Sequence, residues 1–239
     1  MSAPDFAEPD FPTVLIPGLF CSPRLYAAQL PALWGFGAVM VADHRRDDSV
    51  AGIAARLLEE APPRFGLVGL SMGGYVAFEV MRQAPERVAK LALLDTSARP
   101  DAPEQTEKRL AQIARVHRGE FEQVVEAAFP GLVAPQHANT PALRDVVRAM
   151  ARDTGPDAFV RQQQAILGRP DSRPLLATIA CPTLVLRGVD DQLIPAEHAD
   201  EMAANIPGAH SVRVPACGHL STLERPDDVT HALVTHWHA

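Results

Sequence analysis

Six short apolar runs are the feature that most limits how this chain can fold. They cover residues 13–16, 38–42, 65–70, 88–94, 183–187 and 211–214. Several are rich in Val, Leu and Ile and lack the polar alternation of a half-exposed strand, so we expect strands buried on both faces. Helical patterns lie between them, at residues 23–33, 50–60, 72–84, 196–205 and 226–237. This alternation predicts an α/β fold with a mostly parallel, twisted sheet and helices on both faces.

One long stretch, residues 99–171, breaks this rhythm. It contains no convincing strand, but four helical segments separated by Pro and Gly, at residues 104–116, 121–128, 141–152 and 157–167. A crossover between parallel strands normally needs a single helix. We therefore expect an all-helical cap, residues 99–171, inserted into an α/β core formed by residues 1–98 and 172–239.

Composition excludes several classes of protein. A chain of 239 residues with a net charge of -7 and no Lys/Arg run does not predict a nucleic-acid partner. No apolar stretch reaches the roughly 18 residues of a membrane span, and residues 1–12 lack the features of a signal peptide. Three widely spaced cysteines do not form a disulfide framework. We expect a cytoplasmic protein, monomeric or homodimeric, that binds neither nucleic acid nor membrane.

The segment 65–74 predicts a strand, a tight turn and a helix, and it contains G-x-S-x-G at Gly69, Ser71 and Gly73. A sharp turn between strand and helix would strain the serine backbone and leave no room for side chains two positions away, which favours glycine there. It would also expose the Ser71 hydroxyl at the amino end of a helix, where free N–H groups favour an oxyanion. A purely structural turn is the alternative interpretation.

A serine nucleophile needs a base, and the base needs an orienting acid. His219 is the candidate base, because it lies in a glycine-containing loop after the last strand and therefore at the same sheet edge as Ser71. The other histidines have simpler interpretations: His44 follows a strand in a charged stretch, and His236 is expected at the surface of the last helix.

Three aspartates could be the acid. Asp190 and Asp191 lie in an acidic turn after the strand at 183–187, and Asp95 lies at the end of the strand at 88–94. All three would lie at the carboxyl edge of the sheet. The residues alone favour none of them decisively, because an aspartate can also satisfy turn amides or cap a helix.

Together these motifs resemble the α/β-hydrolase fold family, specifically its small cytoplasmic esterase-like members with a helical cap. The resemblance covers about residues 13–237. The family's acid typically lies in a G-x-x-D-x-x-x-P segment, which here selects Gly188, Asp191 and Pro195 and so favours Asp191. Residues 218–226 are similar to the family's catalytic-histidine loop, which supports His219.

The resemblance also implies an oxyanion hole. Its first N–H would come from Met72, the residue after the nucleophile, and its second from Leu19, with Phe20 as the neighbouring alternative. The family commonly has His-Gly before this position, whereas this chain has Pro17. This departure concerns how the loop is supported. It does not remove the oxyanion hole, because the hole uses backbone N–H groups rather than a side chain.

These features predict a serine hydrolase that cleaves a small carboxylic ester through an acyl-enzyme, without metal or cofactor. The same triad would serve a lactonase, a thioesterase or a C–C bond hydrolase, and a non-catalytic ligand-binding homologue is a further alternative. The cap would form the pocket roof. Its Arg144, Arg148 and Arg152 form a basic stripe that could face an acidic substrate, but we favour a solvated face.

Overall fold

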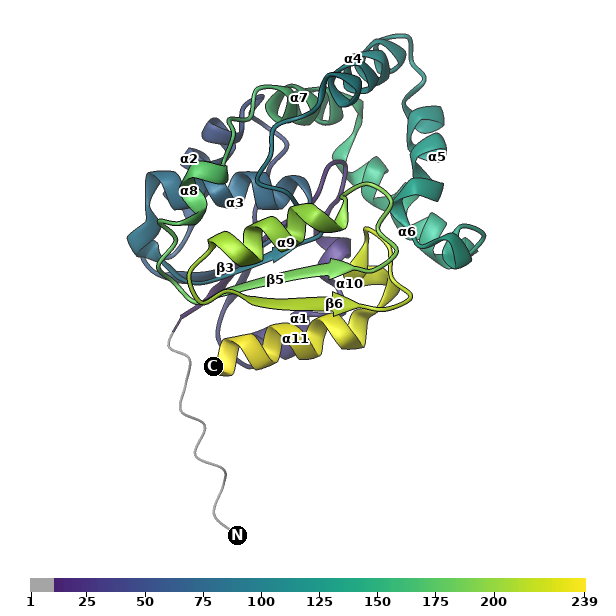
Figure 1. Cartoon of the computed structure of the whole chain (residues 1–239). Coiled ribbons are helices and arrows are strands. Elements are labelled where there is room, and N and C mark those ends of the chain that lie inside the picture. Colours follow the sequence, from purple (N-terminus) through teal and green to yellow (C-terminus); the bar gives the residue numbers. More distant parts are fainter. Residues whose placement is uncertain (1–10) are drawn as a thin grey trace.

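The structure is a computed structural model that describes residues 11–239. The expectation that the chain begins without a signal peptide falls mostly on residues 1–10, outside the described residues. Within the described part the strands are, in chain order, β1 (Thr13–Ile16), β2 (Val39–Val41), β3 (Phe65–Leu70), β4 (Val88–Leu94), β5 (Thr183–Gly188) and β6 (His210–Val214). They form one sheet in the order β2-β1-β3-β4-β5-β6, and each neighbouring pair is parallel (Figure 1).

Helices of two groups surround this sheet. Those between or after the strands of the core are η1 (Pro23–Tyr26), α1 (Leu30–Trp34), α2 (Val50–Glu60), α3 (Met72–Gln83), η2 (Pro85–Arg87), α8 (Arg173–Leu176), α9 (Ala196–Asn205), α10 (Ser221–Glu224) and α11 (Pro226–His238). Those between β4 and α8 are α4 (Pro103–His117), α5 (Phe121–Leu132), η3 (Pro135–His137), α6 (Pro141–Thr154) and α7 (Pro156–Leu167).

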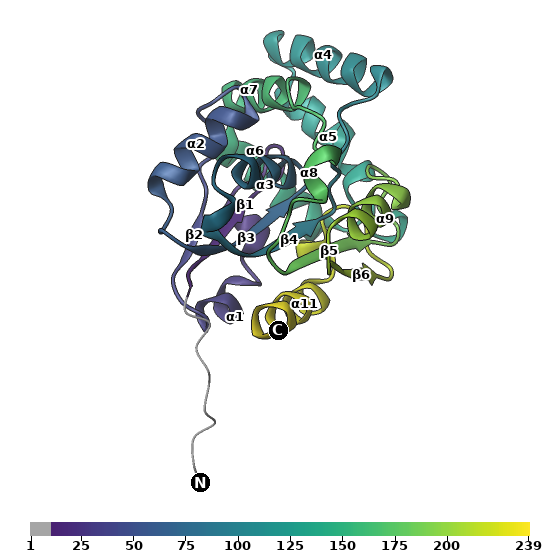
Figure 2. The ribbon, with the colours of Figure 1, turned by 60° about the vertical axis from the view of Figure 1, so that its left-hand side comes forward.

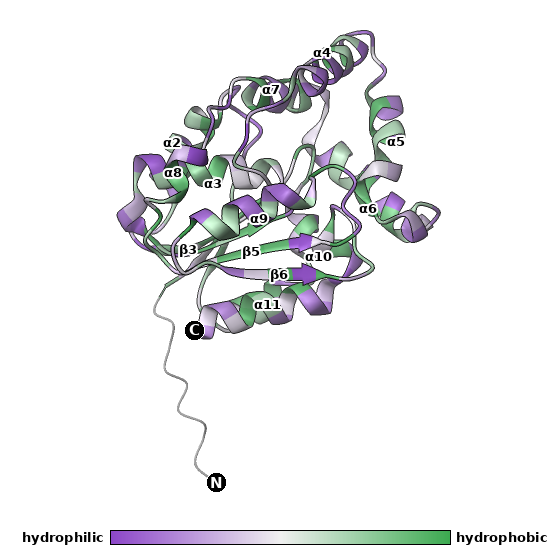
Figure 3. Cartoon of the chain, viewed as in Figure 1, coloured by the Kyte–Doolittle hydropathy of each residue, from purple (hydrophilic) through white to green (hydrophobic). Residues whose placement is uncertain are grey.

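Both faces of the sheet are covered. In β1, Val14 and Ile16 point into one apolar cluster and Leu15 into another, and all three are fully buried. Figure 2 shows α1 and α11 on one face of the sheet and α2, α3 and α9 on the other. Figure 3 accordingly shows β5 mostly in the colour of apolar residues, whereas the edge strand β6 is more polar. The predicted α/β fold, with a parallel sheet between two layers of helices, is confirmed.

Two predicted helices differ clearly from the structure, whereas the others agree with it to within two residues at each end. The helix expected at 23–33 is two short pieces, η1 and α1. Pro31 explains the break, because it has no N–H for the carbonyl four residues earlier and its ring would collide with that carbonyl. The helix expected to end at 128 continues to Leu132, with Pro130 in its last turn.

Helices α4 to α7 lie over the edge of the sheet where the parallel strands end (Figure 1). Their apolar residues, among them Val124, Met150 and Phe159, join the same cluster as Leu70 of β3 and Phe20 after β1. The cap is therefore packed onto the core above the strand ends. The division of the chain into a cap at 99–171 and a core remains a prediction.

The strand order determines where the loops at the carboxyl ends of the strands lie. After β1 the chain passes to β2 on one side, and after β3 it passes to β4 on the other, so the two loops diverge at the carboxyl edge. Ligands of open α/β sheets bind in the crevice at such a switch point. The loops after β4, β5 and β6 end at the same edge. Among residues 11–239, no helix has both the length and the apolar character needed to cross a bilayer.

Candidate active site

Ser71 occupies the single position between β3 and α3, and its backbone is strained. Its φ is 56° and its ψ is -115°, a conformation that costs a residue with a side chain about 1–3 kcal/mol. Three hydrogen bonds hold its backbone there. Its N–H donates to the Leu94 carbonyl at 2.9 Å, and its carbonyl accepts from the Thr96 hydroxyl at 2.7 Å and from the Gly74 N–H at 2.9 Å. The turn thus presents the Ser71 side chain above the sheet edge.

The glycines of the motif are required by close contacts between β1, β3 and α3. A Cβ atom on Gly73 would lie 2.0 Å from the Ile16 carbonyl oxygen, and one on Gly69 would lie 2.4 Å from the Gly73 carbonyl oxygen. Both neighbours are backbone atoms, which cannot rotate away. The steric reason for G-x-S-x-G expected from the sequence therefore agrees with the packing.

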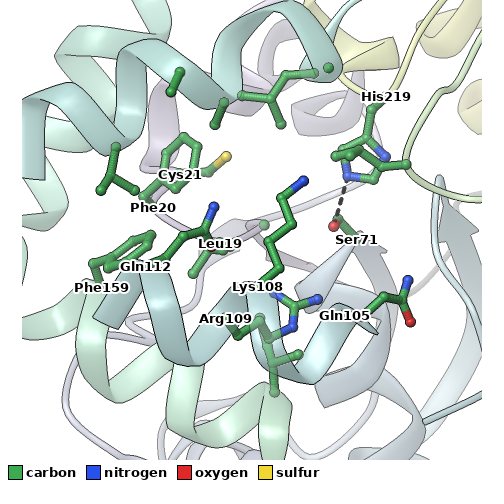
Figure 4. A pocket seen from close by; sticks show the side chains of 18 of the residues that line it. Leu19, Phe20, Cys21, Ser71, Gln105, Lys108, Arg109, Gln112, Phe159 and His219 are labelled. Atoms are coloured by element: carbon green, nitrogen blue, oxygen red, sulfur yellow. Dashed lines mark hydrogen bonds between the residues drawn. The ribbon is translucent and has the colours of Figure 1, made fainter. Parts of the chain in front are cut away.

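His219 lies between Ser71 and Asp191. Its Nε2 is 2.8 Å from Ser71 Oγ and its Nδ1 is 2.9 Å from Asp191 Oδ2; Figure 4 shows the first of these contacts. A carboxylate can only accept hydrogen bonds, so the ring proton is on Nδ1. The lone pair of Nε2 is then free to accept the Ser71 hydroxyl proton. Three residues from the ends of β3, β5 and β6 thus form one hydrogen-bonded chain.

Burial and neighbouring charges shift the pKa values of Asp191 and His219. Burial alone would raise the pKa of the Asp191 carboxyl, but His219 and the N–H groups of Leu193 and Ile194, at 2.8 and 3.1 Å, hold that pKa below its ordinary value. Burial would lower the pKa of the His219 imidazole, yet the facing Asp191 carboxylate raises it. Asp191 therefore stays anionic and stabilises the imidazolium form of His219.

The other two aspartates are engaged elsewhere. Asp190 is half-buried and accepts a long hydrogen bond from Gln136 at 3.4 Å. Asp95 is fully buried and accepts from the Gly188 N–H at 2.8 Å and from the Ser221 hydroxyl at 2.5 Å. Burial, and then the Asp191 charge, raise the pKa of Asp95 to about 7. Asp95 therefore ties the loops after β5 and β6 together below the His219–Asp191 pair.

The loop after β1 lies beside Ser71, and its amides differ in what they bind. The Phe20 N–H donates to Gln162 Oε1 of α7 at 2.9 Å. No acceptor among residues 11–239 is in hydrogen-bonding geometry with the Leu19 N–H. Met72 is the first residue of α3, so its N–H has no partner within the helix. Leu19 and Met72, the two amides predicted from the sequence, thus have no hydrogen-bond acceptor that the structure shows among residues 11–239.

His44 provides scaffolding that the sequence analysis did not assign to it. Its side chain is buried, and its Nε2 lies 2.9 Å from the Gly18 carbonyl, which fixes the proton on Nε2 because a carbonyl only accepts. Burial lowers the pKa of His44, which keeps the ring neutral. His44 thus supports the loop in which Pro17 replaces the family's histidine. Its position after β2 at the carboxyl edge was the available signal.

Two more buried polar side chains connect the cap to these loops. Gln162 of α7, besides accepting from Phe20, donates from Nε2 to the His44 carbonyl at 3.4 Å. Glu224 of α10 accepts from the Gly218 N–H at 2.9 Å, just before His219, and from the Ala134 N–H of the cap at 2.7 Å. Gln162 belongs to no sequence motif, and Glu224 lies within residues 218–226, whose resemblance to the family's catalytic-histidine loop assigned no role to it.

Ser71 and His219 open into a cavity of about 440 Å³ between cap and core. The loop after β1 and helices α4, α5 and α7 line most of the rest of it, together with Tyr75 of α3 and with Leu193 and Ile194 after β5; Figure 4 shows part of this lining. Arg144, Arg148 and Arg152 are not among its lining residues. Arg144 and Arg148 pair with Glu126 instead, which agrees with the solvated interpretation of the stripe. In the described part of the chain, no cluster of His, Cys, Asp and Glu could hold a metal ion.

One expectation about the last helix differs from the structure. His236, expected at the surface, is buried, and its Nε2 lies 3.1 Å from the Leu91 carbonyl; the prediction for this residue is wrong. The side of α11 that carries His236 packs against the sheet, and the neighbouring Trp237 is buried there as well. The proposed triad and oxyanion residues all lie at one sheet edge.

Comparisons with known proteins agree with the fold and with the hydrolase class. Residues 10–232 match the model of the alpha/beta hydrolase family. The chain is 29% identical over 217 residues to a pimeloyl-[acyl-carrier protein] methyl ester esterase of Nitrosomonas europaea, covering 85% of this chain and 81% of that protein.

Solved structures give the same picture. A thermophilic esterase from Thermogutta terrifontis superposes with a TM-score of 0.84 at 30% identity, over 96% of this chain and 91% of the other. The enol-lactonase from Burkholderia xenovorans has a TM-score of 0.85 at 24% identity, over 95% and 90% of the two chains, and supports the fold alone. The chain is an enzyme of the hydrolase class, and it belongs to the alpha/beta hydrolase family.

Proposed function

We propose that the chain hydrolyses small carboxylic esters through an acyl-enzyme on Ser71, with His219 as the base and Asp191 as the orienting acid. The observation that carries the proposal is the continuous relay from Ser71 Oγ to His219 Nε2, at 2.8 Å, and from His219 Nδ1 to Asp191 Oδ2, at 2.9 Å. The relay opens into a cavity of about 440 Å³, which suits a small substrate. Relatives named as esterases support the ester as the bond that is cleaved.

In the first half of the reaction, His219 Nε2 takes the Ser71 hydroxyl proton while Oγ attacks the ester carbonyl carbon. The imidazolium that forms is stabilised by the buried Asp191 carboxylate, which stays ionised throughout. Collapse of the tetrahedral intermediate breaks the bond to the alcohol oxygen. His219 gives its proton to that oxygen, and the alcohol leaves.

The oxyanion of the tetrahedral intermediate would be bound by the N–H groups of Met72 and Leu19. Neither amide has a protein acceptor within residues 11–239, whereas the Phe20 amide is occupied by Gln162. The Met72 amide is also at the positive end of α3, which adds a favourable dipole. Each such donor contributes on the order of a hundredfold to the rate.

In the second half, water takes the place of the alcohol. His219 removes a proton from water as it attacks the acyl carbon, and the same amides bind the second oxyanion. His219 then returns the proton to Ser71 Oγ as the carboxylic acid leaves. The chain's own residues therefore supply every proton transfer, and the cycle ends with the relay restored.

A panel of esters, a lactone and a thioester of similar size tests this function. Wild-type protein should hydrolyse small esters most efficiently, and Ser71→Ala should lower kcat by about a millionfold, as loss of a triad serine does elsewhere. Arg152→Gln, on an exposed position away from the cavity, is the control and should keep full activity. Turnover of esters by Ser71→Ala at the wild-type rate would contradict the proposal, and a strong preference for the lactone or thioester would correct the substrate class.

We also propose that the protein acts in the cytoplasm as a monomer or homodimer. Its three cysteines are free, and Cys21 and Cys217 are buried, as in proteins of reducing compartments. Size-exclusion chromatography with light scattering distinguishes one or two copies from larger assemblies, which would contradict this part of the proposal.

A further inference from the structure

The lining of the active-site cavity is unbalanced in charge. Its described lining residues include no Asp or Glu, but they include three cations of the cap helix α4: Lys108, Arg109 and Arg115. The chain as a whole has a net charge of -7, so the excess of cations in the cavity opposes the overall composition. A cavity lined by one sign of charge attracts ligands of the opposite sign.

The two arginines are already paired. Arg109 donates to Asp101 at 2.6 Å and to Gln163 at 2.9 Å, and Asp101 also binds Arg169 at 2.7 Å. Arg115 donates to Glu120 at 2.8 Å. Asp101 is shared by Arg109 and Arg169, and Glu120 by Arg115 and Arg118, so these clusters keep positive charge, but the Arg109 and Arg115 side chains are held by their partners.

Lys108 is different. No carboxylate among residues 11–239 lies within 4.0 Å of its ammonium group, and it makes no hydrogen bond within that part of the chain. Glu104 lies one turn before it, a spacing that favours an ion pair on a helix surface, yet the two are not paired. Figure 4 shows the Lys108 side chain extending from α4 into the space that Ser71 and His219 face.

Helix α4 presents Gln105 and Gln112 to the cavity along with Lys108, one turn before and one turn after it. These amides can donate hydrogen bonds as well, and in Figure 4 Gln112 lies on one side of the Lys108 side chain and Gln105 on the other. The amide oxygens of both glutamines are engaged, Gln105 Oε1 by the Ala102 N–H at 2.9 Å and Gln112 Oε1 by Gln163 Nε2 at 2.7 Å, which leaves their amide N–H groups as donors for a ligand. An apolar acyl chain would offer no acceptor to these donors or to the Lys108 ammonium. A group with several acceptor oxygens would satisfy them.

We propose that Lys108 binds a carboxylate of the substrate, so that the preferred ester carries a carboxylate remote from the bond that is cleaved. Gln105 and Gln112 would complete the anion site from the same helix face. This inference rests on the proposed ester hydrolysis and adds the substrate's charge to it. The carboxylate could belong to the acyl part or to the alcohol part of the ester, and the two cases are separable.

Matched pairs of esters test the proposal. For the acyl part, monomethyl adipate is compared with methyl hexanoate; for the alcohol part, the acetate ester of γ-hydroxybutyrate is compared with butyl acetate. The ratio of kcat/KM for the charged over the neutral ester should exceed one in one arm. Lys108→Gln should lower that ratio by about tenfold to a hundredfold, the range expected for a lost charge-assisted hydrogen bond. Lys108→Glu should lower it further, and added salt should weaken the wild-type preference.

Arg152→Gln removes one positive charge from the exposed surface of α6, outside the cavity, and should leave the ratio unchanged. Labelling of Ser71 by an uncharged fluorophosphonate verifies that each variant keeps its site. If wild type labels and hydrolyses neutral esters but Lys108→Gln leaves the ratio unchanged in both arms, the anion site is wrong while the hydrolase function stands. If wild type neither labels nor hydrolyses any ester, the proposed function fails and this inference fails with it.

Discussion

His219 and Asp191 share a hydrogen bond of 2.9 Å between Nδ1 and Oδ2, although a second carboxylate lies buried below the same pair. That second carboxylate, Asp95, has both oxygens engaged by Gly188 and Ser221. The histidine therefore contacts one acid while the other fixes the loops that hold the pair. The two aspartates should respond differently to substitution.

Asp191→Asn should lower kcat by about ten-thousandfold, because an amide at this position favours the wrong tautomer of His219 and removes the charge that stabilises imidazolium. Asp95→Asn should cost about tenfold or less, since its amide can still accept from the Gly188 N–H and can donate to the Ser221 hydroxyl. Steady-state kinetics on one neutral ester compares the two. A large loss in Asp95→Asn with full activity in Asp191→Asn would show that the acid is Asp95.

The pH dependence of the reaction follows from the environment of His219. The base must be neutral to accept the Ser71 proton, so kcat/KM should fall as pH decreases through the pKa of His219. Asp191 raises that pKa above the ordinary value of 6.5, so the acid limb should lie above pH 6.5. In Asp191→Asn the limb should move to lower pH. A limb below 6.5 in the wild type, or one that Asp191→Asn leaves in place, would contradict this electrostatic account.

Gln162 should control the loop after β1, because its Oε1 accepts the Phe20 amide from a fully buried position. Gln162→Ala leaves that N–H without a partner, which costs about 1–3 kcal/mol of stability, and frees the loop that presents Leu19. We expect kcat to fall by about tenfold or more with a smaller change in KM.

Gln164, on the same helix but exposed, provides the matched control. Gln164→Ala should keep both the stability and the kcat of the wild type. Chemical denaturation and steady-state kinetics measure the two effects separately. Equal behaviour of Gln162→Ala and Gln164→Ala would show that the cap does not hold the loop.

Gly73→Ala should damage both the fold and the site, because its Cβ would lie 2.0 Å from the Ile16 carbonyl oxygen and must displace either β1 or α3. Overpacking of this kind costs about 1–3 kcal/mol or more. Gly168→Ala is the control, since its nearest neighbour would be at an ordinary 3.6 Å. Thermal unfolding of the two variants measures the difference, and equal midpoints would contradict the steric role of Gly73.

The parts of the fold that the sequence predicted well are those with a local cause. The strands at 13–16, 65–70 and 88–94 have the bounds that their apolar runs indicated, because burial on both faces removes polar residues from them. The fold class, the family and the ester-hydrolase class are confirmed by the sheet and by the relatives. The roles of Ser71, Asp191, His219, Met72 and Leu19 remain predictions, although the structure brings these residues to one edge.

The parts that sequence reasoning missed depend on contacts between distant segments. Gln162 meets Phe20 across 142 positions, and nothing in either segment indicates that the two are neighbours. His44 looked like a polar residue in a charged stretch, because its partner, the Gly18 carbonyl, is a backbone group that leaves no sequence signal. Lys108 was not singled out, because the rotation of α4 relative to the cavity is set by cap packing rather than by its own pattern.

The most direct test of the central claim is to find which residue is the nucleophile. Wild-type protein is treated with a fluorophosphonate, digested, and analysed by mass spectrometry, with Asp191→Asn and Ser71→Ala in parallel. We predict stoichiometric modification of Ser71 in the wild type, much slower modification in Asp191→Asn, and none in Ser71→Ala. Modification at another residue, or an unmodified Ser71 in a protein that still hydrolyses esters, would contradict the Ser71–His219–Asp191 relay.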